Sequence, residues 1–133
     1  MSERPHAIMT EARVLEFFDA CNGGDADAIA SFFTHDAVYR GSIGVSDEGT
    51  VFDGVDEVRE GMASFLGAYD DARYSDVVVH VFGDRGFATW TFSGTPVSGA
   101  RFTYRGVDIL EFANGLIRSK DAYRKERTKP IDA

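Results

Sequence analysis

The chain has 133 residues, a net charge of −8, 44% hydrophobic and 13% aromatic residues, and a single cysteine. Its length and apolar content are those of one folded domain with a substantial core, which excludes a disordered chain. The negative charge argues against nucleic-acid binding, which depends on Lys and Arg facing phosphate, and a lone cysteine excludes an internal disulfide. No apolar run could cross a bilayer and the N-terminus lacks a signal-peptide pattern, so we expect a cytoplasmic protein without nucleic-acid or membrane partners.

The first half of the chain has the sequence patterns of helices. Apolar residues recur at helical spacing after Thr10, and Asn22, Gly23 and Gly24 suit the end of that helix. Asp25 suits the N-cap of a short second helix. The predicted elements are helices over residues 10–22, 26–33 and 55–69, a brief strand over 36–40 and an irregular loop over 41–54.

Strand patterns dominate the second half. The predicted strands cover residues 74–82, 87–94 and 102–112, followed by a return strand after the turn at Asn114-Gly115. Helices followed by antiparallel strands predict an α+β domain, and long aromatic-rich strands around helices tend to leave a pocket. Because no repeat or linker interrupts the chain, we expect a single domain over 1–133 with flexible tails at 1–9 and 126–133.

Two aspartates interrupt apolar strand faces in the last hairpin. Side-chain alternation puts Asp108 on the face of Tyr104, and the return strand is expected to put Asp121 beside Ile117. A carboxylate on such a face is costly unless it is hydrogen-bonded, protonated or lining a wet cavity. Desolvation is expected to raise the pKa of Asp108 above its ordinary value of about 3.9. The structural alternatives are an Asp108 bonded to backbone N–H groups or Arg105, and an Asp121 paired with a basic residue from elsewhere.

Four segments of the chain carry a family pattern. They are Phe17–Asp25, Phe33–Tyr39, Gly54–Arg59, and Tyr104–Asp108 continuing through Asn114–Ile117. In this order they resemble the nuclear transport factor 2-like superfamily and, within it, the SnoaL-like (polyketide cyclase and ketosteroid isomerase-like) family, over residues 11–125. The resemblance implies a cone-shaped α+β barrel, with N-terminal helices packed on a curved, mostly antiparallel sheet, a deep apolar pocket and a homodimer. It does not imply one chemistry, because members include isomerases, cyclases, dehydratases, epoxide hydrolases and non-catalytic binding domains.

The resemblance allows two catalytic patterns of the family to be tested on this chain. A ketosteroid isomerase needs a carboxylate base and an oxyanion hole made by a tyrosine and a neutral carboxylic acid. Asp108 falls at the position of that acid, but Phe17 stands in place of the tyrosine and Gly41 in place of the base. Steroid isomerisation is therefore not expected. Epoxide hydrolysis of the limonene type is excluded as well, because the strand at 87–93 lacks the required Arg-x-Asp.

A SnoaL-like cyclase needs an acid/base group beside its bound polyketide, and Asp121 resembles the family's catalytic aspartate. The resemblance thus makes Asp121 the candidate proton acceptor and Asp108 the hydrogen-bonding acid, with Tyr39 or Tyr123 as orienting groups. Ligand contacts are expected from Phe17, His35, Tyr39, Phe65, Trp90, Tyr104 and Tyr123. Plain core packing is the alternative for the aromatic residues, and helix capping for His35.

Basic residues also gather near the end of the chain, at Arg124, Lys125, Arg127 and Lys129. They form either an anion-binding patch or a solvated strand end and tail. No metal-ligand spacing or phosphate-binding loop occurs, so neither a metal nor an organic cofactor is expected. We expect a domain that binds a small, mostly apolar organic ligand. As an enzyme it would be a cofactor-independent acid/base isomerase, cyclase or lyase; the alternative is a non-catalytic ligand-binding or dimerisation module.

Overall fold

The computed structural model describes residues 8–129. Residues 1–7 and 130–133, which hold most of the first expected tail and half of the second, lie outside the described residues; within the first tail, Met9 is buried in the core. The elements in chain order are α1 (Glu11–Gly23), α2 (Ala26–Ala30), β1 (Phe33–Arg40), β2 (Val51–Asp53), α3 (Val55–Gly67), β3 (Tyr69–Phe82), β4 (Arg85–Pro96), β5 (Phe102–Ala113) and β6 (Leu116–Arg124). Within residues 8–129 no helix combines the length and apolar character needed to span a membrane.

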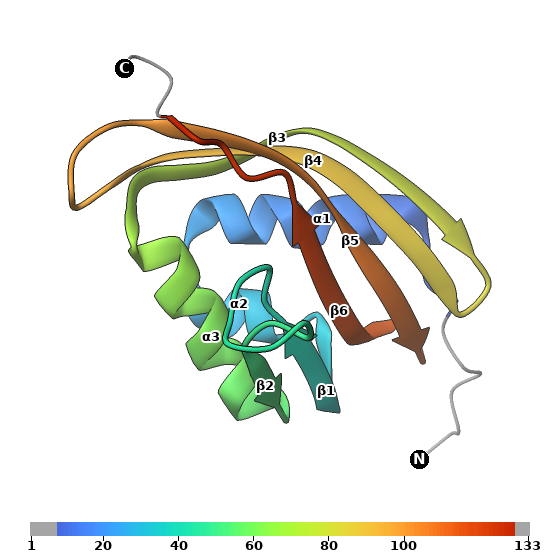
Figure 1. The fold of residues 1–133 in the computed structure, drawn as a ribbon. Coiled ribbons are helices and arrows are strands. Elements are labelled where there is room, and N and C mark those ends of the chain that lie inside the picture. Colours follow the sequence, from blue (N-terminus) through green and yellow to red (C-terminus); the bar gives the residue numbers. More distant parts are fainter. Residues whose placement is uncertain (1–7, 130–133) are drawn as a thin grey trace.

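One six-stranded sheet curves over the helices (Figure 1). Its strand order is β2-β1-β6-β5-β4-β3, in which β1 and β6 run parallel and every other neighbouring pair is antiparallel. α1 packs against β3 and α3 against β1, on the same face of the sheet. We call this helix-covered face the inner face and the opposite one the outer face. The predicted α+β class, with N-terminal helices on a curved and mostly antiparallel sheet, is confirmed.

The helices begin and end where their capping residues stand. Thr10 accepts a hydrogen bond from the Arg13 backbone N–H, and Gly24 ends α1 at φ 75°, a left-handed conformation that glycine adopts without strain. The predicted N-cap Asp25 accepts bonds from two backbone N–H groups at the start of α2. At the end of α1 the Asn22 side chain exchanges two hydrogen bonds, of 2.9 and 2.7 Å, with the backbone of Tyr74. These bonds fasten α1 to β3 between two irregularities of that strand.

Several element bounds differ from the sequence expectation. β3 begins at Tyr69 rather than at residue 74, so α3 ends two residues early, at Gly67. Two other regions differ as well. α2 ends at Ala30 and β1 already begins at Phe33, because Phe33 pairs with Ile117 of the neighbouring β6. The predicted irregular loop contains a short strand, Val51–Asp53, paired with β1. In both places a pairing partner distant in sequence extends the sheet, which local residue patterns do not record.

A β-bulge in the last hairpin decides which side chains of β6 face the helices. Next to the Asn114-Gly115 turn, Phe112 pairs with Ile117, but the preceding residue of β5, Glu111, pairs with Ser119. β6 has thus gained one residue relative to β5, and a one-residue slip exchanges the two faces of a strand. Beyond the bulge Lys120 lies on the inner face, whereas Asp121 lies on the outer face. The expectation that Asp121 shares a face with Ile117 is wrong for this reason.

Candidate functional site

Asp108 and Lys120 form an ion pair inside the domain. Lys120 pairs with Leu110 across the hairpin, so its side chain is a diagonal neighbour of Asp108 on the inner face. Lys120 Nζ lies 3.1 Å from Asp108 Oδ1, and the two side chains are 1% and 0% exposed. The Lys120 ammonium also lies over the ring of Tyr39, 4.6 Å from its centroid. The pair is therefore buried on the inner face of the sheet, away from solvent.

Burial and charge act on the two partners of this pair in different ways. Burial raises the pKa of Asp108, and the neighbouring Lys120 and the Trp90 indole N–H offset only part of that increase. Burial alone would lower the pKa of Lys120, but the attraction of Asp108 and the proximity of Tyr39 outweigh it, so the Lys120 pKa is raised. The expectation of a desolvated Asp108 agrees with this environment. Its partner, however, is Lys120 rather than Arg105 or backbone N–H groups.

Aromatic side chains surround a small space next to the ion pair, which we call the inner pocket. Its walls are Tyr39, Ser42, Phe65, Tyr74, Trp90, Phe92, Tyr104, Lys120, Ala122 and Arg124, and its volume is about 10 Å³. That volume is of the order needed for a single water molecule. A larger ligand must displace side chains to enter.

Three buried polar atoms around the inner pocket have no hydrogen-bond partner within the described residues: Trp90 Nε1, Asp108 Oδ2 and Arg124 Nε. Trp90 is 6% exposed and the Arg124 side chain 9%. A buried donor or acceptor without a partner is costly, and such groups are uncommon in folded proteins. Trp90 and Arg124 line the inner pocket, so their N–H groups are the ones within reach of a molecule bound there. Asp108 is not among the lining residues; it contacts Lys120, and the Trp90 N–H lies near enough to lower its pKa.

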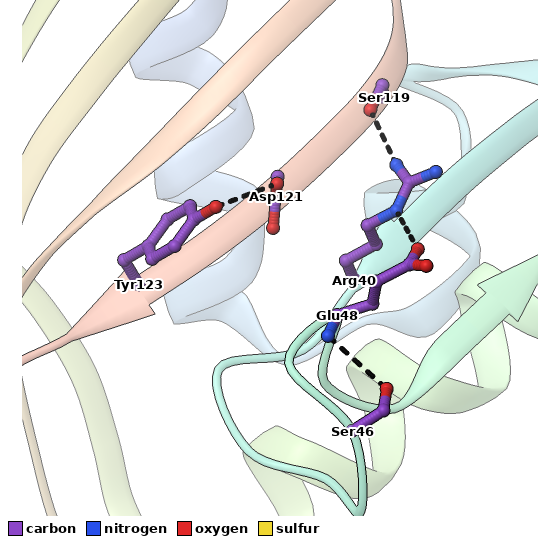
Figure 2. A network of polar contacts seen from close by, with 6 residues as sticks. All are labelled: Arg40, Ser46, Glu48, Ser119, Asp121 and Tyr123. Carbon is purple, nitrogen blue, oxygen red and sulfur yellow. Dashed lines mark hydrogen bonds and ion pairs between the residues drawn. The ribbon is translucent and has the colours of Figure 1, made fainter.

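Asp121 belongs to a separate, outer-face network (Figure 2). Tyr123 donates a hydrogen bond of 3.4 Å to Asp121 Oδ2, and nearby Arg40 reaches Glu48 at 3.2 Å and Ser119 at 3.4 Å. Asp121 also lines an open groove of about 350 Å³ between β6 and the loop at 41–49. The two candidate catalytic aspartates therefore lie on opposite faces of the sheet.

The predicted ligand-contacting residues divide in the same way. Tyr39, Phe65, Trp90 and Tyr104 converge on the inner pocket. Phe17 is fully buried in the core among other phenylalanine rings. His35 is exposed on β1, and Tyr123 is 54% exposed on the outer face.

Sequence reasoning missed Lys120 and Arg124 as inner-pocket residues. A regular two-residue hairpin at Asn114-Gly115 would pair Asp108 directly with Asp121, and Lys120 would then face outward. The predicted Asp108–Asp121 pairing could itself have indicated a bulge, because two like charges directly opposite each other destabilise a sheet. Elsewhere in the described part of the chain, no group of three or more His, Cys, Asp and Glu side chains is arranged to hold a metal ion.

The chain matches the SnoaL-like domain family over residues 14–120. No curated protein matches it. Among solved structures, it is similar to a protein with a ketosteroid isomerase-like fold from Catenulispora acidiphila, solved with trimethylamine (14% identity, 92% of this chain and 91% of that one covered, TM-score 0.76). It is also similar to a candidate polyketide cyclase from Xanthomonas campestris pv. campestris (20%, 84% and 87%, 0.72) and to SalBIII, an epoxide hydrolase/cyclase-like enzyme of pyran ring formation in salinomycin (22%, 86% and 89%, 0.69). At these identities the similarity concerns the fold.

Proposed function

The chain belongs to the SnoaL-like domain family, and from that premise we propose that it binds a small, mostly apolar organic molecule in the inner pocket and moves a proton on it through Asp108. The chemistry is that of a cofactor-independent isomerase or cyclase. Similarity in fold to a candidate polyketide cyclase and to SalBIII is compatible with ring closure.

One observation carries the proposal: a fully buried carboxylate whose second oxygen, Oδ2, has no protein partner. Burial raises the pKa of Asp108, so its ionised form is a stronger base than an ordinary carboxylate. The Trp90 N–H, which lowers the pKa of Asp108, and the Lys120 ammonium stand beside it as donors. A base beside hydrogen-bond donors in a dry site suits proton abstraction next to a carbonyl.

The reaction we propose uses these groups in one sequence. The carbonyl oxygen of a bound ketone accepts a hydrogen bond from Lys120 or Trp90, and Asp108 takes a proton from the adjacent carbon. The electron pair of the broken C–H bond moves toward the carbonyl oxygen to give an enolate, which the two donors stabilise. When the ketone carries a β,γ-double bond the product is a dienolate, and return of the proton from Asp108 to its γ-carbon is an isomerisation. Attack of the enolate α-carbon on a second carbonyl closes a ring, and the alkoxide formed takes the proton back from Asp108.

The sequence-based assignment of Asp121 as the proton acceptor requires a different binding place. On the outer face, Asp121 could act only on a molecule held in the groove beside the loop at 41–49. Of the two carboxylates, Asp108 is the one enclosed by apolar side chains, and we propose it for the proton transfer.

A non-catalytic ligand-binding module is the second candidate function. It is favoured by the inner pocket's volume of about 10 Å³ and by the direct 3.1 Å contact that already neutralises Asp108. In this case the ion pair would be structural, and the pocket would open only to bind.

A homodimer formed through the outer face is part of the proposal. Val78 and Phe82 of β3, Ile109 of β5 and Tyr123 of β6 expose between 46% and 64% of their surfaces on that face. Apolar side chains grouped in this way mark interaction surfaces. Light scattering coupled to gel filtration would measure twice the 14.6 kDa chain mass for a dimer, and a Phe82→Glu variant would reduce it to one chain.

Exchange of carbon-bound protons tests the chemistry without knowledge of the natural substrate. The probe is 2-tetralone, a bicyclic apolar ketone with exchangeable α-protons, followed by proton NMR in D₂O. We expect the protein to accelerate exchange over buffer, Asp108→Asn to abolish the acceleration, and Asp121→Asn to retain it.

The outcomes separate the candidate functions. Loss of exchange in Asp121→Asn with retention in Asp108→Asn would return the role to Asp121. Binding of 2-tetralone, seen by quenching of Trp90 fluorescence, without any exchange would support the non-catalytic module. Absence of both binding and exchange would contradict a pocket for apolar ketones.

A further inference from the structure

A second cavity lies on the outer face of the sheet, opposite the inner pocket. This outer groove has a volume of about 680 Å³, and the charged side chains in its wall on that face are Arg105, Lys125 and Asp76.

Trp90 and Arg124 belong to the walls of both cavities. Their side chains lie on the inner face, whereas the residues on either side of them, such as Thr89, Tyr123 and Lys125, face outward. The hydrogen-bonded sheet itself therefore separates the outer groove from the inner pocket, and Arg124 acts on the inner pocket alone.

Arg124 has hydrogen-bonding capacity left over. Its guanidinium stacks on the ring of Tyr104, with Cζ 4.0 Å from the ring centroid, and Nη2 lies 3.5 Å from Glu126 Oε2. Nε has no partner although the side chain is only 9% exposed. Glu126 is 62% exposed on its side chain, so water screens its attraction for the guanidinium.

The charges around the inner pocket leave one cation in excess. Asp108 and Lys120 offset each other at 3.1 Å, whereas Arg124 has only the screened Glu126 beyond the pocket wall. An arginine held flat on an aromatic ring, with free N–H groups toward a cavity, matches the planar geometry of a carboxylate.

We infer that the ligand of this domain is an organic carboxylate, whose acid group is received by Arg124 in the wall of the inner pocket while its apolar body fills that pocket. Arg124 is then the residue that determines ligand specificity. The inference rests on the proposed function, since it requires that the inner pocket take up a ligand. The bound carboxylate satisfies Arg124 Nε and replaces Glu126 as the principal counter-ion.

Trp90 allows a direct measurement, because it is the chain's only tryptophan and stands in the wall of the inner pocket. Quenching of its fluorescence is followed during titration with 3-phenylpropionate and with 3-phenylpropan-1-ol, which differ in charge but share the apolar body. We expect the acid to bind the wild-type protein at least about tenfold more tightly than the alcohol, as a charge-assisted hydrogen bond to a buried guanidinium predicts.

Arg124→Gln removes the charge and keeps a polar side chain of similar reach. It should weaken binding of the acid by about tenfold or more and change binding of the alcohol by less than about threefold. The matched control is Arg85→Gln, which removes a cation from β4 outside both cavity walls and should leave the preference for the acid intact.

The outcomes distinguish the two levels of the proposal. Equal affinity for acid and alcohol in the wild-type protein overturns the role of Arg124 and leaves the ligand pocket standing. Absence of quenching by both probes overturns the pocket and the carboxylate inference together. If Arg124→Gln does not fold, the ¹H–¹⁵N resonance of Arg124 Nε in the wild-type protein decides: it must shift on addition of the acid and not of the alcohol, and an unmoved resonance overturns the inference.

Discussion

Lys120 and Asp121 are neighbours in the chain and lie in opposite environments. Lys120 is fully buried against Asp108 on the inner face, while Asp121 lies on the outer face beside Tyr123 and near solvent. Both are charged residues of the same strand, so neither composition nor secondary structure explains the difference. The bulge between Glu111 and Phe112 does, because it sets which residue faces the helices. Solvent access then decides how strongly each charge affects stability and pKa.

Breaking the inner pair should have the largest effect. Lys120→Met leaves the Asp108 carboxylate buried without a counter-ion, and we expect the free energy of unfolding to fall by about 3–5 kcal/mol. Urea denaturation followed by Trp90 fluorescence measures it. Replacing both partners, as Asp108→Leu with Lys120→Met, should recover most of the loss, since it removes both desolvation costs. A single variant as stable as the wild-type protein would contradict a buried, ionised pair.

Gly106→Ala should lower the free energy of unfolding by an intermediate amount, through a clash with Trp90 on the inner face. Gly106 pairs with Trp90 across β4 and β5, and a Cβ there would lie 2.8 Å from Trp90 Cζ3 and closer still to the Tyr123 carbonyl oxygen. We expect a loss of about 1–3 kcal/mol from this overpacking, together with a shifted Trp90 emission spectrum. Gly67→Ala, where a Cβ meets no neighbouring atom, is the matched control. An unchanged spectrum in Gly106→Ala would contradict the packing of Trp90 on this glycine.

The pH dependence of the free energy of unfolding should show how burial affects the ionisation of Asp108 and Lys120. Folding raises the pKa of Asp108 above its ordinary 3.8, so the stability linked to this group is complete below pH 3.8 and is lost as pH rises through the folded-state pKa. Folding also raises the pKa of Lys120 above 10.5, so its contribution is lost as pH rises beyond that value. Relative to the double variant lacking both groups, the wild-type free energy of unfolding should fall in these two steps. A difference that instead rises with pH above 3.8 would mean that attraction by Lys120 outweighs desolvation of Asp108.

Most of the secondary-structure elements and the α+β class could be predicted from the sequence. Helical periodicity, the Asp25 cap and the Asn114-Gly115 turn are local signals, and the structure confirms the elements they predict. The apolar face around Asp108 followed from simple alternation along β5, which has no irregularity there.

The features that could not be predicted from the sequence depend on pairing between strands that are distant along the chain. β2 and the early start of β1 exist because neighbouring strands offer hydrogen bonds, and the face of Lys120 depends on a bulge that no glycine or proline marks. The partner of Asp108 was therefore missed, although the face of Asp108 itself was predicted. The role of Asp121 stays a prediction that exchange measurements on 2-tetralone can test.

Asp121→Asn should have the smallest effect, which makes it the reference for every inner-face variant. Its hydrogen bond from Tyr123 is long, at 3.4 Å, and water can replace it in the single chain. At protein concentrations low enough to dissociate the proposed dimer, we therefore expect the free energy of unfolding to change by less than about 0.5 kcal/mol. The same urea denaturation measures it. A loss approaching that of Lys120→Met would mean that Asp121 is not solvated as its outer-face position implies, for instance because a second copy of the chain covers it. Repeating the measurement at several protein concentrations would separate these causes, since only burial between two copies makes the loss depend on concentration.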